Sequence, residues 1–213
     1  MNKNDVFKRL IEEETSTKQR LFYSGVHLFS TKGYSNVGIR ELCRSVNVKE
    51  SAFYNHYSSK EELFQKILAY FDETSNQVVF TEEEIEAVVR SCDIRFFFEE
   101  NMKKFISFTG NPLYHTILQI VLMESYINPR AYQIAQHNLY HLRKGYTEQI
   151  LTRMMGNGCI KKCNAEVVTA EYYYALKGLL DEYLLLETWD KNTQVIRQKI
   201  AEHIDFFANL LQK

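Results

Sequence analysis

Hydrophobic side chains recur every three or four residues along most of the chain, a spacing that predicts helices from end to end. One such stripe covers residues 20–32 and stops at Gly33, the residue type that most readily takes the left-handed conformation after a helix. Shorter stripes cover residues 39–46 and about 49–57, and Asn47 between them tolerates a positive φ. Two short helices joined by a sharp turn are typical of a helix-turn-helix.

The same periodicity predicts further helices beyond this segment. They cover residues 59–75, 82–90, 93–108, 112–123, 129–155, 165–188 and 193–211. Ser58 with Glu61, and Thr81 with Glu84, have the spacing of a capping box, although 82–90 fits a mobile loop equally well. The predicted fold is all-α, with a three-helix helix-turn-helix head over residues 1–66 (motif about 38–57) and a larger helical domain over 67–213.

Several short segments of the head, taken together, indicate which family of helix-turn-helix proteins the chain resembles. The segments are Leu28-Phe29, Gly33-Tyr34, Ile39-Arg40-Glu41-Leu42-Cys43, Val46-Asn47-Val48, Phe53-Tyr54-Asn55-His56-Tyr57 and Ser59-Lys60-Glu61-Glu62-Leu63. Together they resemble the N-terminal domain of the tetracycline-repressor (TetR) family of bacterial transcription regulators. The resemblance covers about the first third of the chain. The remainder is similar to the family's helical C-terminal domain in length and helix pattern alone.

The resemblance implies a DNA-binding regulator whose third helix contacts operator DNA. The residues expected there are Arg40 and Lys49 at the groove edge, Tyr54, His56 and Lys60 at phosphates, and Ser51, Ala52 and Asn55 near bases. Of these, Asn55 is expected to read adenine, because an amide matches the edge of that base.

Three positions depart from the family pattern. Asn47 stands where glycine is common, and Val37 and Gly38 replace the hydroxyl residues that usually open the second helix. Lys49 occupies the usual Ser or Thr N-cap of the third helix, a loss of ~1 kcal/mol. A nearby phosphate would make this lysine favourable, and a tolerated surface lysine fits the sequence equally well.

Charge is distributed unevenly, although the formal net charge is only −1. Through residue 66 there are 11 basic and 8 acidic residues, so the head carries +3 and the rest of the chain −4. A basic head suits DNA binding that is confined to one end. The sequence shows no signal-peptide core and no apolar run of membrane-spanning length, so the chain is expected in the cytoplasm.

Four cysteines, at positions 43, 92, 159 and 163, are too few and too scattered for a zinc framework. Cys159 and Cys163 lie close in sequence, but nothing nearby supplies a second ligand pair. The expectation is reduced, buried or partly buried thiols, with redox sensing left open. Neither a metal nor a cofactor is predicted.

The last two predicted helices indicate a homodimer. Residues 165–188 carry apolar side chains on more than one face, and residues 193–211 carry a cleaner apolar seam. The resemblance implies that this pair forms a four-helix dimer bundle, whereas the alternative is packing within the monomer. The residues predicted at the interface are Leu176, Leu180, Tyr183, Ile196, Ile200 and Phe207.

The middle helices mix aromatic side chains with a few polar ones, as small-molecule pockets do. The residues predicted to bind a ligand are Phe97, Phe105, Tyr114, Gln119, Met123, Tyr126, His137 and His141. A filled aromatic core would give the same pattern. The predicted function is a repressor that a mostly apolar or aromatic effector releases from its operator.

Two other functions are alternatives to a DNA-binding regulator. His137 and His141 are four residues apart, but the Glu of a zinc-hydrolase motif is missing between them, and no nucleophile or phosphate-loop motif accompanies them. An enzyme that uses the central histidines is therefore not expected. The other alternative is a helical protein-interaction module that has lost operator reading.

Overall fold

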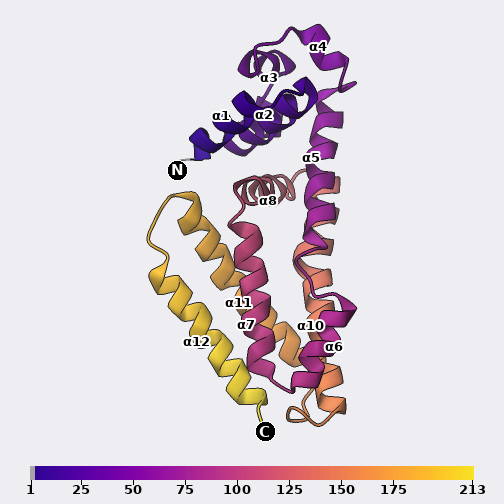
Figure 1. Ribbon diagram of the computed structural model, residues 1–213, viewed down its shortest axis with the longest axis vertical. Helices are drawn as coiled ribbons and strands as arrows, with labels where there is room; N and C mark the ends of the chain where they lie inside the picture. Colours follow the sequence, from indigo (N-terminus) through magenta and orange to yellow (C-terminus); the bar gives the residue numbers. More distant parts are fainter. Residues whose placement is uncertain (1–2) are drawn as a thin grey trace. The chain divides into compact units, whose positions relative to one another are not determined.

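The computed structural model describes residues 3–213, and these fold into helices grouped in two compact units (Figure 1). Unit 1 contains the chain through Val78 together with Ile106–Tyr140, and unit 2 contains Val79–Phe105 and His141–Lys213. The all-α prediction is confirmed. Between residues 3 and 213 the only extended pairing is a single bridge from Ile160 to Gln212, within unit 2.

Unit 1 is built from short and medium helices. They are α1 (Lys3–Glu13), α2 (Thr17–Lys32), η1 (Tyr34–Asn36), α3 (Ile39–Ser45), α4 (Glu50–Tyr54), α5 (Lys60–Ser75), α8 (Pro112–Glu124) and α9 (Pro129–Ala135). As predicted, α2 stops at Gly33, whose φ is 78° and whose N–H donates to the Phe29 carbonyl at 2.9 Å. Helix α1 was not predicted, although Val6 and Phe7 are buried and Phe7 stacks on His27.

The core of unit 1 forms where α5 crosses α2 and α8. The side chains of Leu63, Ile67 and Phe71 are fully buried. A Cβ atom on Gly25 would lie only 3.0 Å from Leu63 Cδ2 and 3.1 Å from Ile67 Cδ1. Glycine at this position of α2 therefore allows α5 to approach closely.

Unit 2 is built from longer helices. They are α6 (Glu82–Ser91), α7 (Ile94–Thr109, in this unit through Phe105), α10 (Leu142–Gly156), α11 (Ala165–Thr188) and α12 (Gln194–Leu211). The capping box at Thr81 is confirmed, because Glu84 N–H donates to Thr81 Oγ1 at 3.3 Å and Thr81 N–H donates to Glu84 Oε2 at 2.8 Å. None of the helices formed by residues 3–213 combines the length and apolar character that a membrane span requires.

Two local predictions are wrong. The cap of α5 is Ser59, whose hydroxyl accepts from Glu62 N–H at 3.1 Å, rather than Ser58 with Glu61. Ser58 instead donates its N–H and hydroxyl to the Glu62 carboxylate, at 2.7 Å each, and these bonds hold the pKa of Glu62 below its ordinary value. Because Ser58 and Ser59 are both hydroxyl residues followed by glutamates, the sequence pattern fits either register.

The predicted single helix over 129–155 is interrupted by the π-helical segment η2 (Gln136–His141). Asn138, inside that segment, is buried and donates its side-chain amide to Ile134 O at 3.1 Å and to Asp72 Oδ1 at 2.7 Å. A side chain that bonds the carbonyl four residues earlier competes with the regular helical ladder. This competition accounts for the interruption.

The expectation of reduced thiols is wrong for two of the four cysteines. Cys92 and Cys159 form a disulfide in unit 2 with their Cα atoms 4.9 Å apart, whereas Cys43 and Cys163 are free. A pairing across 67 residues has no local sequence signature.

Candidate nucleic-acid interface

The helix-turn-helix of unit 1 consists of α3, a tight turn and α4. Asn47 takes a left-handed conformation in the turn, with φ of 53°, as predicted, and Val48 N–H donates to Cys43 O at 2.9 Å. Leu42 and Phe53 are fully buried beneath the two helices. The motif is therefore held by its own small core and leaves its opposite face open.

Two polar contacts fix this turn to α2. The Arg20 guanidinium donates to Val46 O at 2.8 Å, and the hydroxyls of Ser24 and Ser45 form a hydrogen bond. Arg20 thus donates its hydrogen bond to a backbone carbonyl within the head. Its side chain is half-buried, so it holds the motif in place rather than adding to its outer surface.

Both helices of the motif begin without a side-chain cap, as the departures from the family pattern predict. Gly38 precedes α3 and Lys49 precedes α4, and neither makes a capping hydrogen bond. Helix α4 ends at Tyr54, earlier than predicted, and Tyr57 N–H then donates to Phe53 O at 2.9 Å. Tyr57 is buried, and its hydroxyl donates to Lys18 O at 3.1 Å, so the chain turns away from the helix here. Burial also raises the pKa of Tyr57 to about 12.

Most of the predicted DNA-contacting side chains are exposed on or beside α4. Lys49, Ser51 and Asn55 are exposed, and 55% of the Tyr54 surface is accessible. Ala52 and His56 are half-buried in the same segment. The structure thus brings a cation, a hydroxyl, an amide and a phenol together around one short helix.

Arg40, also predicted to contact DNA, lies on α3. Its Nε is 2.8 Å from Glu50 Oε1, and both side chains are largely exposed. An ion pair in water contributes only about 0–1 kcal/mol. Arg40 is therefore free to exchange Glu50 for a phosphate at little cost.

Lys60 has a structural task that the sequence did not reveal. Its ammonium donates to Tyr34 O and Val37 O, both at 2.8 Å, and lies 4.2 Å from the centre of the Tyr34 ring. The side chain closes the loop between α2 and α3. Its predicted phosphate contact stays a prediction, and loss of Lys60 is expected to loosen this loop as well.

The same loop is bound from α8. The Tyr34 N–H donates to Glu124 Oε1 at 2.9 Å, and the Tyr34 hydroxyl donates to Glu61 Oε2 at 2.6 Å. Burial, followed by the hydrogen bond and charge of Glu61, raises the pKa of Tyr34. Glu124 is almost fully buried, so this backbone contact satisfies an otherwise costly charge.

The predicted ligand residues divide between the two units. In unit 1, Tyr114 is buried, stacks on Phe71 and shares a hydrogen bond with Ser75 at 3.2 Å, and Gln119 is half-buried. Met123, Tyr126 and His137 are exposed, with 91% of Tyr126 accessible. Within unit 1, Tyr114 therefore belongs to the packed core, and Tyr126 lies on the surface.

In unit 2, Phe97 is fully buried, Phe105 is half-buried under the Arg143 guanidinium, and His141 is exposed.

A polar cluster of Asn101, Tyr146 and Tyr172 in this unit was not predicted from the sequence. Tyr146 donates its hydroxyl to Asn101 Oδ1, and the buried Tyr172 hydroxyl lies near the same Asn101 side chain without forming a hydrogen bond of regular geometry. Burial raises the pKa of both tyrosines.

All six residues predicted at the dimer interface are buried in unit 2. They belong to α11 and α12, two helices that contact each other within unit 2 (Figure 1). The same helices also carry exposed apolar side chains, and Trp189 lies just after α11. These side chains are Val167, Tyr174, Leu185, Trp189, Val195, Phe206 and Leu210. Helices α11 and α12 therefore carry exposed apolar side chains in addition to the six predicted interface residues, whose role in a dimer stays a prediction.

Across residues 3–213 no cluster of three or more His, Cys, Asp or Glu side chains has the geometry to hold a metal ion. His115, on α8, is buried with Nδ1 3.2 Å from Thr109 O, which places it in the packing of unit 1.

Sequence comparison agrees with this geometry. Residues 21–67 match the family described as bacterial regulatory proteins, tetR family. Over 49 residues the chain is 37% identical to the biofilm operon icaADBC HTH-type negative transcriptional regulator IcaR of Staphylococcus epidermidis. That match covers 23% of this chain and spans about a quarter, 26%, of the staphylococcal protein.

Solved structures are similar over nearly the whole chain. A TetR-family transcriptional regulator from Mesorhizobium loti aligns with a TM-score of 0.60 at 12% identity, covering 92% of this chain and 96% of that one. A transcriptional regulator from Saccharomonospora viridis in complex with choline aligns with a TM-score of 0.62 at 14% identity, covering 94% and 100%. At this identity the likeness establishes a shared fold.

Proposed function

We propose that this chain is a TetR-family transcriptional regulator that reads operator DNA through α4, and the match of residues 21–67 to that family supports the proposal. The observation that carries the proposal is the surface of α4. Lys49, Ser51, Tyr54 and Asn55 are exposed on or beside a short helix that a buried core and the turn at Asn47 hold in place.

The proposed contacts fall into two classes. Ser51 and Asn55 are four residues apart and share one face, so they are assigned to base edges, with Ala52 beside them. Tyr54, His56 and Lys60, with Arg40 and Lys49 at the groove edge, are assigned to the backbone. In this arrangement a phosphate near Lys49 supplies the negative charge that the uncapped start of α4 lacks.

We propose that the regulator represses transcription. Support comes from the staphylococcal relatives that match the head, which are named negative transcriptional regulators. The regulator is proposed to release its operator when a small molecule binds.

The proposed effector has an apolar or aromatic body and at least one hydrogen-bonding group. In unit 2 the Tyr172 ring stacks on Phe98 with ring centres 4.3 Å apart, and its buried hydroxyl has only the Asn101 side chain nearby, without a hydrogen bond of regular geometry. Tyr146 and Asn101 already pair close by. A carbonyl or hydroxyl of an effector would satisfy the Tyr172 hydroxyl, which otherwise carries a desolvation penalty of about 1–3 kcal/mol. Phe97, Phe105 and His141 of the same unit remain proposed contacts of this effector. The predicted ligand residues of unit 1, namely Tyr114, Gln119, Met123, Tyr126 and His137, remain a separate proposal.

Glu124 is the proposed link between α8 and the head. Its carboxylate holds the backbone of Tyr34, and Lys60 holds the same loop from α5. An effector that shifts α8 would therefore change the position of the loop before α3, and with it the positions of α3 and α4. Reciprocity requires operator DNA to weaken effector binding by the same factor, commonly worth about 1–3 kcal/mol.

The functional form is proposed to be a C2 homodimer that uses the exposed apolar surface of α11 and α12. A helix pair that leaves Tyr174, Leu185, Phe206 and Leu210 exposed has apolar surface for a partner to cover. Two heads in one symmetric dimer would bind a roughly palindromic operator.

Operator binding is tested by fluorescence anisotropy with labelled duplexes from the region upstream of the gene, at several salt concentrations. Asn55→Ala is expected to weaken binding to the preferred sequence by about 1–3 kcal/mol while leaving nonspecific binding unchanged. Gln133→Ala, an exposed position on α9, is the matched control. Equal affinity of the wild type for every duplex, with no effect of Asn55→Ala, would reject sequence reading by α4.

A further inference from the structure

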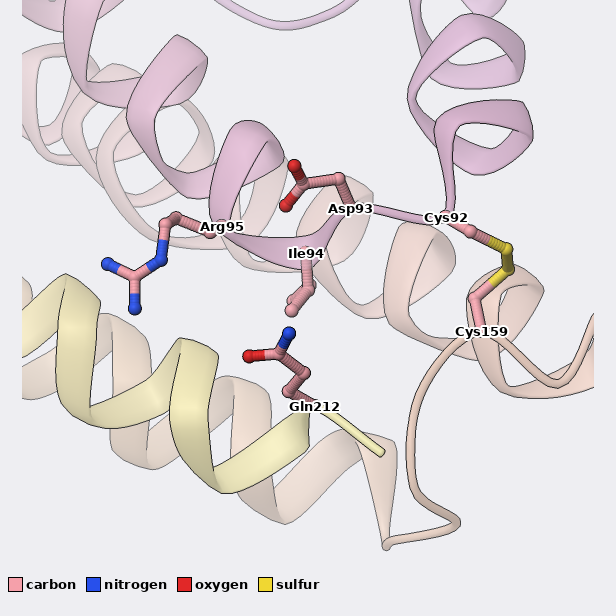
Figure 2. Close-up of a pocket in the computed structure, with 6 residues that line it drawn as sticks. All are labelled: Cys92, Asp93, Ile94, Arg95, Cys159 and Gln212. Atoms are coloured by element: carbon pink, nitrogen blue, oxygen red, sulfur yellow. A yellow bond between two sulfur atoms is a disulfide. The ribbon is translucent and has the colours of Figure 1, made fainter.

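The disulfide in unit 2 joins the ends of two helices that are far apart in sequence. Cys92 caps the C-terminus of α6 in a left-handed conformation, with φ of 54°, and Cys159 lies in the connection that follows α10 (Figure 2). Cys159 N–H donates to Met154 O at 2.9 Å, which ties that connection to the last turn of α10. The Cα separation of 4.9 Å lies within the range that an S–S bond spans.

Both cysteines line a surface recess of about 340 Å³. Figure 2 shows Asp93, Ile94, Arg95 and Gln212 around the same recess. Cys92 is exposed and Cys159 is half-buried. A small molecule can therefore reach the bond, whereas the free Cys43 is buried.

Basic residues lie close to Cys159 in sequence, and both Arg95 and Asp93 line the recess. The Lys213 ammonium lies 3.4 Å from the position that a Cβ on Gly158 would take, immediately before Cys159 in sequence, and Lys161 and Lys162 follow it. Arg95 lines the recess, although Asp205 and Asn209 also bind its guanidinium. Positive charge favours a thiolate at Cys159 and attracts an anionic thiol to the recess.

We propose that Cys92–Cys159 is a reversible thiol–disulfide exchange site operated by a small-molecule thiol and its disulfide. The proposal rests on the proposed function, because a DNA-binding regulator works in a compartment where disulfides are usually transient and redox-sensing. In this reading the bond reports the redox state of the cell, and its recess is the binding site for the small thiol.

Reduction proceeds in two exchange steps. The thiolate of the small molecule attacks Sγ of the exposed Cys92, a mixed disulfide forms there, and the electron pair of the broken bond leaves on Cys159 Sγ. A second small thiolate then attacks the small-molecule sulfur of the mixed disulfide, and Cys92 leaves as a thiolate. Both cysteines take protons from water, the small thiol is oxidised to its disulfide, and the reverse sequence closes the bond again.

The bond is positioned to affect α12 as well as α6. Just after Cys159, Ile160 pairs with Gln212, and Lys161 N–H donates to Leu211 O at 2.9 Å. Arg95, three residues after Cys92, binds the Asp205 carboxylate of α12. Closing the disulfide therefore joins the end of α6 covalently to the segment that holds the end of α12, the helix proposed to meet the partner copy.

The test uses the full-length chain equilibrated in glutathione buffers of graded oxidised-to-reduced ratio. Alkylation followed by peptide mass analysis should show residues 92 and 159 passing together from free thiols to a disulfide, with Cys163 alkylated throughout. Full reduction is expected to lower Tm by roughly 5–15 °C, since the bond closes a long loop. Cys92→Ser should start at the lower Tm and show no redox dependence, whereas the control Cys163→Ser should behave as the wild type.

A bond that native protein keeps in excess dithiothreitol, or a Tm that is the same in both states, would overturn the proposal. Formation of a Cys159–Cys163 pair instead would overturn it as well. The titration needs no DNA, so it stands or falls separately from operator binding. Anisotropy measurements in the two redox states form a separate arm, and absence of all DNA binding would reject the proposed function while leaving the exchange result intact.

Discussion

Helix α4 in unit 1 and the pair α11–α12 in unit 2 both leave a surface uncovered, but the two surfaces differ in chemistry. Around α4 the exposed groups include an ammonium, a hydroxyl, a phenol and an amide, together with the Glu50 carboxylate that pairs with Arg40, whereas the exposed side chains of α11 and α12 include several aromatic and aliphatic ones. The first surface suits a hydrated, charged polymer, and the second suits another apolar surface. Salt should therefore weaken contacts at α4 strongly and contacts at α11–α12 little.

The two regions also differ in how they are held. Helix α4 has only five residues and no N-cap side chain, so its position depends on the buried Phe53 and on contacts made by neighbouring segments. Helix α11 has 24 residues and a cap from Asn164, which accepts from Val167 N–H at 3.2 Å. Substitutions at α4 should therefore change recognition, while substitutions at α11 and α12 should change folding or assembly.

The largest expected effect comes from charging the inner face of α12. Ile200 is buried against α11, so Ile200→Asp places an unpaired carboxylate in the core of unit 2. The free energy of unfolding should fall by about 3 kcal/mol or more. Urea denaturation followed by circular dichroism measures this loss, and an unchanged midpoint would show that this face is not part of the monomer core.

The outer face of the same helix should respond differently. Phe206 is exposed, so Phe206→Asp should leave the unfolding midpoint close to that of the wild type while separating the proposed dimer. Losing the second head should then cost about 100-fold or more in operator affinity. Light scattering and anisotropy on the same samples check this pair of results, and a dimer that persists in Phe206→Asp would place the interface elsewhere.

An intermediate effect is expected where α8 holds the loop between α2 and α3. Glu124→Ala leaves the Tyr34 N–H without its acceptor, and an unsatisfied buried donor costs about 1–3 kcal/mol. Thermal denaturation should show the loss in unit 1, and the exposed Glu73→Ala serves as the control. Operator affinity should fall too, because the loop sets the start of α3. A variant with full stability would show that this carboxylate does not anchor the head.

Replacing Lys49 with serine should raise the stability of the head while weakening its affinity for DNA. Lys49→Ser supplies the missing cap of α4, so the free energy of unfolding should rise by roughly 0.5–2 kcal/mol. Affinity for all duplexes should nevertheless fall, and the salt dependence should lose about one phosphate equivalent. Gains in both stability and affinity would mean that no phosphate lies near residue 49.

The smallest effect concerns pH, and one histidine in each unit, His27 and His203, should report it. Burial lowers the pKa of His27 in unit 1 and of His203 in unit 2 below the ordinary value of 6.5. The unfolded chain then takes up these protons first, so the stability they contribute is complete above pH 6.5 and is lost as pH falls through the folded pKa. Unfolding midpoints of His27→Gln and His203→Gln between pH 7 and pH 5 should each vary less than in the wild type, and an identical pH dependence in all three would contradict this.

The fold followed from the sequence wherever one local signal decided the structure. Gly33 ended α2, Asn47 made the turn, Thr81 with Glu84 started α6, and α11 begins and ends at the predicted residues 165 and 188. Helix α1 could have been found, because its apolar positions have helical spacing. The cap of α5 was misplaced by one residue because two serines offered equivalent registers.

The site was less predictable because its details depend on tertiary contacts. Whether Leu176 or Tyr174 meets a partner depends on which face of α11 packs against α12, and both faces are apolar in sequence. Lys60 resembles a free surface lysine until the carbonyls of the preceding loop are placed beside it. The disulfide and the Asn101–Tyr146 pair likewise join residues that no local pattern connects.

The central claim, that α4 reads operator DNA from a symmetric dimer, is tested most directly by selecting duplexes from a random library with the purified chain and sequencing the bound fraction. The selection should enrich a two-fold symmetric site whose half-sites lie about one helical turn, roughly 34–36 Å, apart or a multiple of that distance. The same selection with Asn55→Ala should lose preference at one base position in each half-site. A bound fraction with no enriched sequence, or one that Asn55→Ala leaves unchanged, would contradict the claim.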